Sequence, residues 1–240
     1  MAATETGGQG QEGSLRLAGS MIAEVVPTTA ASAELFTDPP DVVLFEAELA
    51  SVSRAVESRR LEFGTVRHCA RKALSELGYP PVPLLKGERG EPLWPSGIVG
   101  SMTHCAGYRA AAVARAEDTF TLGIDAEPHQ GLPDGVSGLV AFAEENAQLA
   151  RLRAADDSVC WDRLLFSCKE AIYKAWFPLT GRWLGFEDVC VVIDPFDNTF
   201  LARLLVPGPI LSGEPRQVLA GRWLVRDGLI LTATGIPIDS

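Results

Sequence analysis

The feature that most constrains this chain is a pair of short segments whose charged residues recur at fixed spacings: Gly123–Glu127 and Phe166–Trp176. In the first, Asp125 and Glu127 are two residues apart, so an extended strand would place both carboxylates on one face, about 6–7 Å apart. In the second, Glu170 and Lys174 are four residues apart and would share one face of a helix. Together these segments offer three carboxylates for a hard cation and ammonium groups for phosphate. This combination is typical of Mg²⁺-assisted transfer of a phosphoryl-containing group.

Each segment also has a simpler interpretation. Alternating acids are common at a solvated strand end, and Lys169, Glu170 and Lys174 would by default form an ion-paired surface of a helix. The same helix also carries bulky apolar side chains, at Phe166, Ile172, Tyr173 and Trp176. Its charges must therefore emerge at a restricted edge, which favours a functional site over a solvated face.

Size and charge narrow the classes of function. A chain of 240 residues can bury a substantial core, as one domain or as two small ones. Its net charge of −10 disfavours nucleic-acid binding, and its apolar runs are too short to span a membrane. Five scattered cysteines without a C-x-x-C pair argue against a disulfide framework or a zinc site, so reduced thiols in the cytoplasm are expected.

The positive charge is concentrated in one part of this acidic chain. Six basic residues fall within nineteen positions, at Arg54, Arg59, Arg60, Arg67, Arg71 and Lys72. A local basic patch on an acidic protein suits a small polyanionic ligand better than a nucleic-acid duplex.

Hydrophobic periodicity and turn residues predict the order of elements. Helices are expected at 44–61, with an interruption at Gly64, and at 65–77, 139–152 and 158–177, where Pro178 would end the last one. Strands are expected at 98–103, 108–115, 119–125, 187–193, 199–205, 216–225 and 229–234. Helices followed by strands, twice over, predict an α+β protein with two lobes, at 21–118 and 119–240. Residues 1–20 are Gly-rich, lack the regions of a secretory signal, and are expected to form a disordered extension.

The two charged segments also carry a family resemblance. G-I-D-x-E at 123–127, followed some forty residues later by F-S-x-K-E-x-x-Y-K at 166–174, resembles the signature of the 4′-phosphopantetheinyl transferases, in particular the two-lobed Sfp type. Further motifs in the N-terminal half resemble the branch that includes enterobactin-synthase component D and its actinobacterial relatives. They are R-R-L-E-F (59–63) with V-R (66–67), K-G-E-R-G (86–90), W-P (94–95) and G-S-M-T-H (100–104).

The resemblance implies a fold, a reaction and partners. The implied fold is α+β, with two similar lobes related by a pseudo-twofold axis, each a small, mostly antiparallel sheet packed with helices. Such a chain would act as a monomer, because its two lobes already build the cleft. It would transfer the 4′-phosphopantetheine arm of coenzyme A to a serine of an acyl-carrier or peptidyl-carrier protein and release adenosine 3′,5′-bisphosphate. The metal would be Mg²⁺, with Mn²⁺ as a substitute.

Two other classes of function remain open. One is a non-catalytic module that binds coenzyme A or a carrier protein. The other is a different Mg²⁺-dependent nucleotide phosphotransferase, although no P-loop or kinase signature supports it.

The resemblance also assigns roles at the reacting centre. The implied metal ligands are three acids and one main-chain carbonyl: Asp125, Glu127, Glu170 and Ala126. Asp125 would lie near the pyrophosphate of coenzyme A. Glu170 is also the implied general base for the acceptor serine. Lys174, and more loosely Lys169, would neutralise charge on the phosphate under attack.

Other residues would bind the rest of coenzyme A. Arg59 and Arg67 are the implied ligands of its 3′-phosphate, while Arg60, Arg67 and Arg71 would share a face of a continuous helix and remain an alternative. His104 would bind a phosphate, with Thr103 beside it; a hydrolase with Ser101 and His104 is disfavoured because no G-x-S-x-G elbow is present. A basic loop would close over the 3′-phosphate or the adenine of coenzyme A; its residues are Lys86, Gly87, Glu88 and Arg89.

Two further contacts are expected by resemblance or position. Leu184, together with Trp183 and Phe186, would line a channel for the pantetheine arm. The loop at 128–138 and the helix after it would contact the carrier protein.

Overall fold

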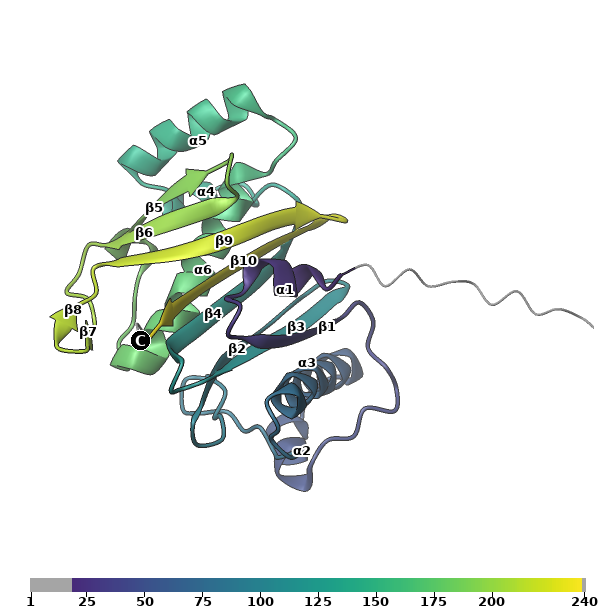
Figure 1. Cartoon of the computed structure of the whole chain (residues 1–240). Coiled ribbons are helices and arrows are strands. Elements are labelled where there is room, and N and C mark those ends of the chain that lie inside the picture. Colours follow the sequence, from purple (N-terminus) through teal and green to yellow (C-terminus); the bar gives the residue numbers. More distant parts are fainter. Residues whose placement is uncertain (1–18, 239–240) are drawn as a thin grey trace, which may run out of the picture.

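Three consecutive strands at 98–128 carry the framework of the fold, which is seen in a computed structural model that describes residues 19–238. β2 (Ile98–Cys105) and β3 (Tyr108–Arg115) form a hairpin, and β1 (Ala31–Leu35) pairs with the other side of β3 in a three-stranded antiparallel sheet. β4 (Thr119–Pro128) instead begins a five-stranded antiparallel sheet in the order β4-β10-β9-β6-β5. The chain therefore changes sheets between β3 and β4 (Figure 1).

The remaining strands lie in the C-terminal half. They are β5 (Val189–Asp194), β6 (Thr199–Leu204), β7 (Ile210–Leu211), β8 (Glu214–Pro215), β9 (Val218–Arg226) and β10 (Leu229–Pro237). β6 alternates between buried and more exposed residues, because one face of the sheet covers the core and the other meets solvent.

Two long helices pack against the sheets. α3 (Glu57–Glu76) covers the three-stranded sheet, and α6 (Trp161–Thr180) packs against β4 and β10 of the larger one (Figure 1). The shorter helices are α1 (Met21–Val25), α2 (Glu46–Val52), α4 (Ser137–Val140), α5 (Ala143–Ala155) and the 3₁₀ turn η1 (Phe186–Asp188). This arrangement confirms the predicted α+β class, with antiparallel sheets packed with helices.

Three hydrophobic cores hold these layers together. One lies between α3 and the small sheet, a second lies between α6 and the large sheet, and the third joins α1 to β3, β4 and β10. β3 is buried on both faces, which is why its sequence reads as a run of small apolar residues, Ala110–Ala114. α1 packs against β9 and β10. Residues 21–25, which the sequence analysis placed in the N-terminal lobe, therefore contact strands of the C-terminal half.

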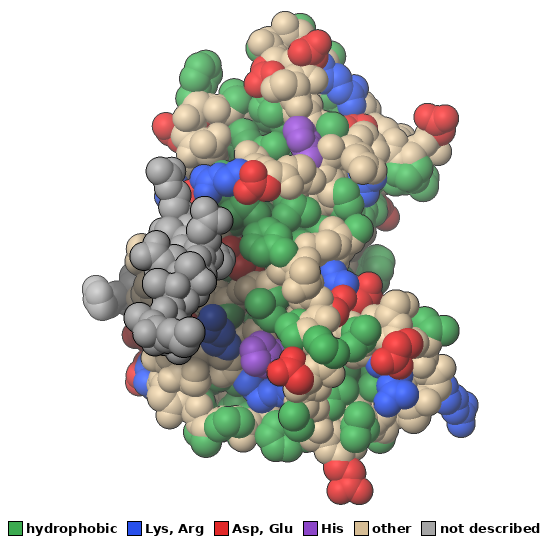
Figure 2. All heavy atoms as spheres, turned by 90° about the vertical axis from the view of Figure 1, so that its right-hand side faces the viewer, with side chains coloured by type: hydrophobic (Ala, Val, Ile, Leu, Met, Phe, Trp, Pro, Cys, Tyr) green, Lys and Arg blue, Asp and Glu red, His purple; other side chains and the backbone are tan. Residues whose placement is uncertain are grey.

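The two sheets meet where β2 runs beside β4. The hydroxyl of Ser101 accepts a hydrogen bond from the amide of Ile124 at 3.1 Å, and that of Thr103 accepts one from the amide of Ala126 at 3.1 Å. Side chains therefore replace a main-chain ladder at this junction. This junction fixes the position of the end of β4, where Asp125 lies. Figure 2 shows one face of the molecule, on which hydrophobic side chains gather between the two halves.

Several predicted boundaries differ from the structure. The first predicted helix is divided at 53–56 rather than at Gly64, which lies inside α3 with Val42 packed close against it. α6 continues past Pro178 to Thr180, because a proline in the last turn of a helix removes only one hydrogen bond there. β1 and α1 were not predicted, and residues 1–18 of the predicted extension lie outside the described residues.

Two broader expectations can be compared with the structure. All five cysteines are free, as predicted. Among the helices of residues 19–238, none combines the length and apolar composition that a membrane span needs.

Gly123 determines how closely β4 approaches α6. A Cβ atom at this position would lie 2.0 Å from the carbonyl oxygen of Ala171 and 2.8 Å from the amide nitrogen of Ala175. Only glycine therefore allows the strand to touch the helix backbone. This contact brings the acids of β4 against the charged face of α6.

Replacement of Gly123 by alanine is expected to destabilise the protein by about 1–3 kcal/mol, because the added methyl group overpacks this contact. Denaturant unfolding measures the change. Gly131→Ala is the matched control, since a Cβ atom there would meet nothing within 4 Å and its backbone is not in the left-handed region. Equal unfolding midpoints for the two variants would contradict this account.

Candidate functional site

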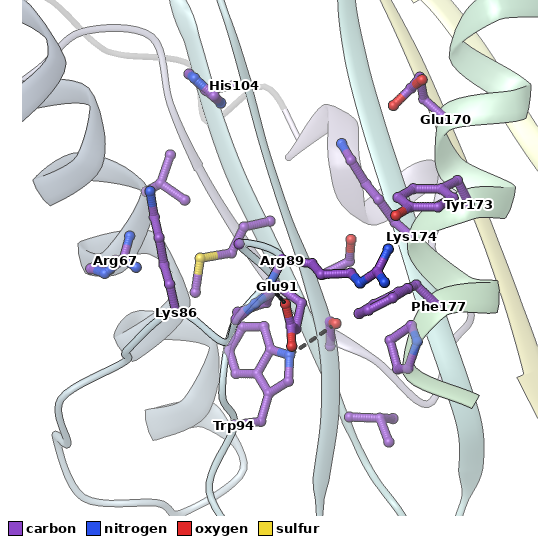
Figure 3. Close-up of a pocket in the computed structure, with 18 of the residues that line it drawn as sticks. Arg67, Lys86, Arg89, Glu91, Trp94, His104, Glu170, Tyr173, Lys174 and Phe177 are labelled. Carbon is purple, nitrogen blue, oxygen red and sulfur yellow. Dashed lines mark hydrogen bonds between the residues drawn. The ribbon is translucent and has the colours of Figure 1, made fainter. Parts of the chain in front are cut away.

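A cavity of about 410 Å³ lies between α3 and β2 on one side and α6 on the other. Figure 3 shows Arg67 and Lys86 on one side of it, and Glu170 and Lys174 of α6 on the other. The cavity thus joins a basic wall to the charged face of α6.

Asp125 is the most heavily bonded acid at this site. It is buried, and Lys174 donates to its Oδ1 at 2.7 Å while the hydroxyl of Ser167 donates to its Oδ2 at 2.9 Å. Thr103 donates to Oδ1 at 3.3 Å. Asp125 therefore connects β2, β4 and α6.

The other two acids lie beside Asp125. Arg163 donates to Glu127 at 2.8 Å, so this carboxylate has a cationic partner on α6. Loss of solvent, and then the charge of Asp125, raise the pKa of Glu127 above its usual value. The pKa of Glu170 is raised by loss of solvent, by Asp125 and, more weakly, by Glu127. The acids of β4 and Glu170 of α6 are therefore close enough to influence one another electrostatically.

These acids do not already form a metal-binding cluster. Within residues 19–238, no three His, Cys, Asp or Glu side chains lie together as metal ligands. Two of the acids are instead ion-paired, Asp125 with Lys174 and Glu127 with Arg163. The donor set nevertheless fits a hard divalent cation. All three donors are carboxylates; burial raises the pKa of two of them, repulsion from Asp125 adds to the rise, and a cation relieves such repulsion.

The sequence left open which arginines form the basic wall of the cavity. Arg59 and Arg67 line the cavity, whereas Arg60 and Arg71 do not. Arg71 instead donates to Glu48 at 2.8 Å and to the carbonyl of Val43 at 3.0 Å. It thereby holds α2 and the segment before it against α3. The structure therefore favours the pair Arg59 and Arg67.

Arg67 is a buried cation in this wall. It donates to the carbonyl of Leu84 at 2.8 Å, and its guanidinium lies 3.3 Å from the centre of the Phe63 ring. Burial lowers its pKa to about 10, against the opposing effect of Glu48. Arg67 remains positively charged at neutral pH, and it faces the cavity with little surrounding water to screen that charge.

His104 and Thr103 are neighbours with different surroundings. His104 lines the cavity and contacts a guanidinium nitrogen of Arg59 through Nε2. Partial loss of solvent and the charge of Arg59 lower its pKa. Thr103 is buried against Asp125 and Ala126 and does not line the cavity. Thr103 thus joins the two sheets, and its expected phosphate contact stays a prediction.

The basic loop contributes two of its four predicted residues. Lys86 and Arg89 line the cavity, whereas Gly87 and Glu88 do not. Gly87 instead shapes the loop through its main chain: its amide donates to the carbonyl of Glu91 at 2.7 Å, and the Glu91 side chain lies close against it. In Figure 3, Arg89 points across the cavity toward α6.

Lys169 does not line the main cavity, although it lines a second cavity beside it. Its side chain is fully buried, and its ammonium group donates to Glu145 at 2.8 Å and to the carbonyls of Val140 and Phe186 at 2.8 Å. All three of its protons are thus directed at protein oxygens. Lys169 is therefore part of the packing of α6, and its expected contribution to phosphate neutralisation stays a prediction.

A second cavity, of about 230 Å³, adjoins the first through residues that line both, Glu170 and Tyr173. Leu184 lines it, together with Trp183 and Phe186. The two cavities form a path past the charged face of α6.

Several residues of the site were not predicted from the sequence. Trp94 and Tyr173 line the main cavity, and Ser167 and Arg163 hold the acids of β4. A helical pattern could have found the last two, because positions 163, 167, 170 and 174 lie on one helix face. Glu62, an acid in a cavity rich in cations, lies within the R-R-L-E-F motif at 59–63 but was assigned no role from the sequence.

Comparisons with known proteins agree with this geometry. The chain matches the family model described as "4′-phosphopantetheinyl transferase N-terminal domain" over residues 45–114, and that of the 4′-phosphopantetheinyl transferase superfamily over residues 121–222. It is 53% identical over 219 residues to the 4′-phosphopantetheinyl transferase Svp of Streptomyces mobaraensis, covering 90% of this chain and 89% of the relative.

Two other relatives extend the comparison. The 4′-phosphopantetheinyl transferase PptT of Mycobacterium tuberculosis is 50% identical over 224 residues, covering 90% of this chain and 97% of the relative. Enterobactin synthase component D of Escherichia coli strain K12 is 31% identical over 196 residues, covering 79% and 84%. Both family models and these relatives show that the chain belongs to the 4′-phosphopantetheinyl transferase superfamily.

Proposed function

We propose that this chain transfers the 4′-phosphopantetheine arm of coenzyme A to a serine of an acyl-carrier or peptidyl-carrier protein. The observation that carries the proposal is the cavity itself, which has Arg59, Arg67 and Lys86 on one side and Asp125 with Lys174 adjoining the other. Relatives about half identical over nine-tenths of the chain are named for this transfer.

Coenzyme A is proposed to occupy the two adjoining cavities. Its phosphate groups would meet Arg59, Arg67, Lys86 and His104, and guanidinium groups suit bidentate contacts with phosphate. The pantetheine arm would pass Glu170 and Tyr173 into the second cavity, toward Leu184. Such a pose leaves the pyrophosphate beside Lys174.

Mg²⁺, or Mn²⁺ in its place, would be held by the three acids and by the main-chain carbonyl of Ala126. When bound, it supplies positive charge at the phosphate oxygens. The acids also contribute through their own chemistry. Glu170 is the proposed general base, and its raised pKa makes it a stronger proton acceptor than an ordinary carboxylate.

In the proposed reaction, Glu170 takes the proton of the acceptor serine as its oxygen attacks the β-phosphorus. A new bond forms between that oxygen and phosphorus, and the pyrophosphate P–O bond breaks. Adenosine 3′,5′-bisphosphate leaves with the bonding electrons. Lys174 donates hydrogen bonds to the phosphate oxygens and stabilises their increasing charge, while the walls of the cavity hold the donor in line.

The acceptor is proposed to dock beside the loop at 128–138. Arg163 fastens this loop by donating to the carbonyls of Gln130 and Gly131, and the same guanidinium also binds Glu127. Leu139 and Phe142 follow it and are exposed. Because carrier proteins and this chain are both acidic, docking would depend on such apolar contacts rather than on long-range attraction.

Two further properties belong to the proposal. Both sides of the cleft come from one chain, which supports a monomer. Free cysteines support a cytoplasmic location.

The two alternative classes are less well supported. A general nucleotide phosphotransferase would not explain the similarity to named phosphopantetheinyl transferases over most of the chain. A non-catalytic module would not need Asp125, Glu170 and Lys174 to remain side by side. The transfer reaction accounts for both observations.

Intact-mass spectrometry of apo carrier proteins, incubated with the protein, coenzyme A and Mg²⁺, tests the reaction. A gain of about 340 Da is expected, the mass of the transferred arm, and EDTA should abolish it. Glu170→Gln is expected to lower turnover at least about 100-fold, since it removes the proposed base. The control is Glu144→Gln on the surface of α5. Normal turnover of Glu170→Gln would rule out the base role, and no gain on a broad panel despite coenzyme A binding would favour a binding module.

Two lysines of α6 give a matched comparison. Lys174→Met is expected to abolish transfer, because Lys174 lies at the reacting centre, with a smaller loss of stability than Lys169→Met, because Lys174 is partly exposed and Asp125 keeps hydrogen bonds from Ser167 and Thr103. Lys169→Met should instead destabilise the protein by about 3–5 kcal/mol, because the buried carboxylate of Glu145 then has no cationic partner. Thermal melting and transfer assays separate the two effects. A stable but inactive Lys169→Met protein would restore Lys169 to the site.

The docking surface can be tested on its exposed leucine. Leu139→Ser is expected to raise the KM for the carrier protein about tenfold, with little change in the KM for coenzyme A. Leu201→Ser, an equally apolar exposed position on β6, is the control. If both variants behave like the unmodified protein, the carrier docks elsewhere.

A further inference from the structure

Glu62 is an unexpected component of the main cavity. It lines the same wall as Arg59 and His104, where a negative charge should repel a phosphate group. One of its carboxylate oxygens, Oε2, accepts a hydrogen bond from Arg59 at 3.1 Å and lies 3.8 Å from Nε2 of His104. Glu62 thus holds two phosphate-facing side chains in place while bringing an unfavourable charge close to them.

The other oxygen of Glu62 meets a cation behind the wall. Oε1 lies 3.4 Å from a guanidinium nitrogen of Arg109, a buried residue of β3 that does not itself line the cavity. The same guanidinium forms a fork with both oxygens of Asp38, at 3.1 and 2.8 Å. Its remaining donors reach the carbonyls of Cys105 and Tyr108.

Arg109 is therefore fixed from several directions at once. Its main chain lies opposite His104 in the β2–β3 hairpin, and its contact with Cys105 closes the turn that follows His104. Bidentate pairing with Asp38 leaves the guanidinium little freedom to rotate. A rigid cation of this kind can hold Glu62 in a single position.

The charges of the network balance only while Arg109 is present. Arg59 and Arg109 are positive, and Asp38 and Glu62 are negative. Without Arg109, the two acids would outnumber the remaining arginine. Glu62 would then draw Arg59 toward itself and present excess negative charge to the ligand.

We propose that Arg109 is a positioning residue for phosphate recognition: through Glu62 it fixes Arg59 and His104 and neutralises the acid that holds them. The inference rests on the proposed function, because it takes the 3′-phosphate of coenzyme A as the group that this wall binds. Arg109 acts without touching the ligand.

The test is binding calorimetry with two ligands that differ only in that phosphate, coenzyme A and 3′-dephospho-coenzyme A. Arg109→Gln is expected to weaken coenzyme A binding about tenfold or more and to leave binding of the dephospho compound nearly unchanged. The double variant Arg109→Gln/Glu62→Gln should bind coenzyme A more tightly than Arg109→Gln alone, because the unneutralised acid is gone.

Controls separate positioning from a general loss of structure. Arg115→Gln also lies on β3, where Arg115 donates to the carbonyl of Leu77, and it should not change the ratio of the two affinities. Arg109→Lys keeps the positive charge but not the two-point contact with Asp38. The ratio of its affinities for coenzyme A and the dephospho compound should therefore lie between those of the unmodified protein and Arg109→Gln. If Arg109→Gln does not fold, the lysine variant alone decides the question.

Three results would overturn the inference: an equal loss of affinity for both ligands, a double variant weaker than Arg109→Gln, or an unmodified protein that binds both ligands equally. Calorimetry measures binding and does not depend on turnover. An unmodified protein that binds coenzyme A but modifies no carrier protein would therefore contradict the proposed function without deciding the role of Arg109. In transfer assays, the loss in Arg109→Gln should appear in the KM for coenzyme A rather than in kcat.

Discussion

The contact between the backbones of β4 and α6 is the constraint on which the site depends. Gly123 lets the strand lie against the helix at Ala171, so the next alternating positions, Asp125 and Glu127, face charged residues of the helix. A larger residue would separate the two elements and lengthen every polar contact between them. The same contact closes the core under the large sheet, so stability and site geometry have a common origin.

Electrostatics divides the cleft into two regions. Cations on α3 and the loop at 86–91 form one wall, and acids gather where β4 meets α6. Each region needs countercharges to exist in the folded protein. Lys174 and Arg163 supply them for the acids, while Glu62 supplies one within the basic wall. The site is therefore a set of coupled charges rather than a collection of independent residues.

The two lysines of α6 show how position within one helix decides a role. Lys174 lies on the face that meets Asp125, whereas Lys169 lies five residues earlier on a different face and enters the core. There it holds Glu145, whose other oxygen accepts the amide of Val191 at the edge strand β5. One buried ion pair thus joins α5, α6 and the sheet edge, a use of charge that favours one specific arrangement of packed elements.

Local periodicity along the chain was enough to predict the α+β class, most strands, and that Asp125 with Glu127 and Glu170 with Lys174 each share a face, because these depend on spacing within one strand or one helix. That the two pairs belong to one site was implied by the family resemblance. Motif spacing also indicated Arg59 and Lys86. Packing between distant segments determined the rest: which arginines face the cavity, that Lys169 and Thr103 turn away from it, and that Arg109 supports Glu62. Sequence patterns could not reveal these outcomes, because contacts such as that of Arg109 with Asp38 form only after the sheets and helices have packed.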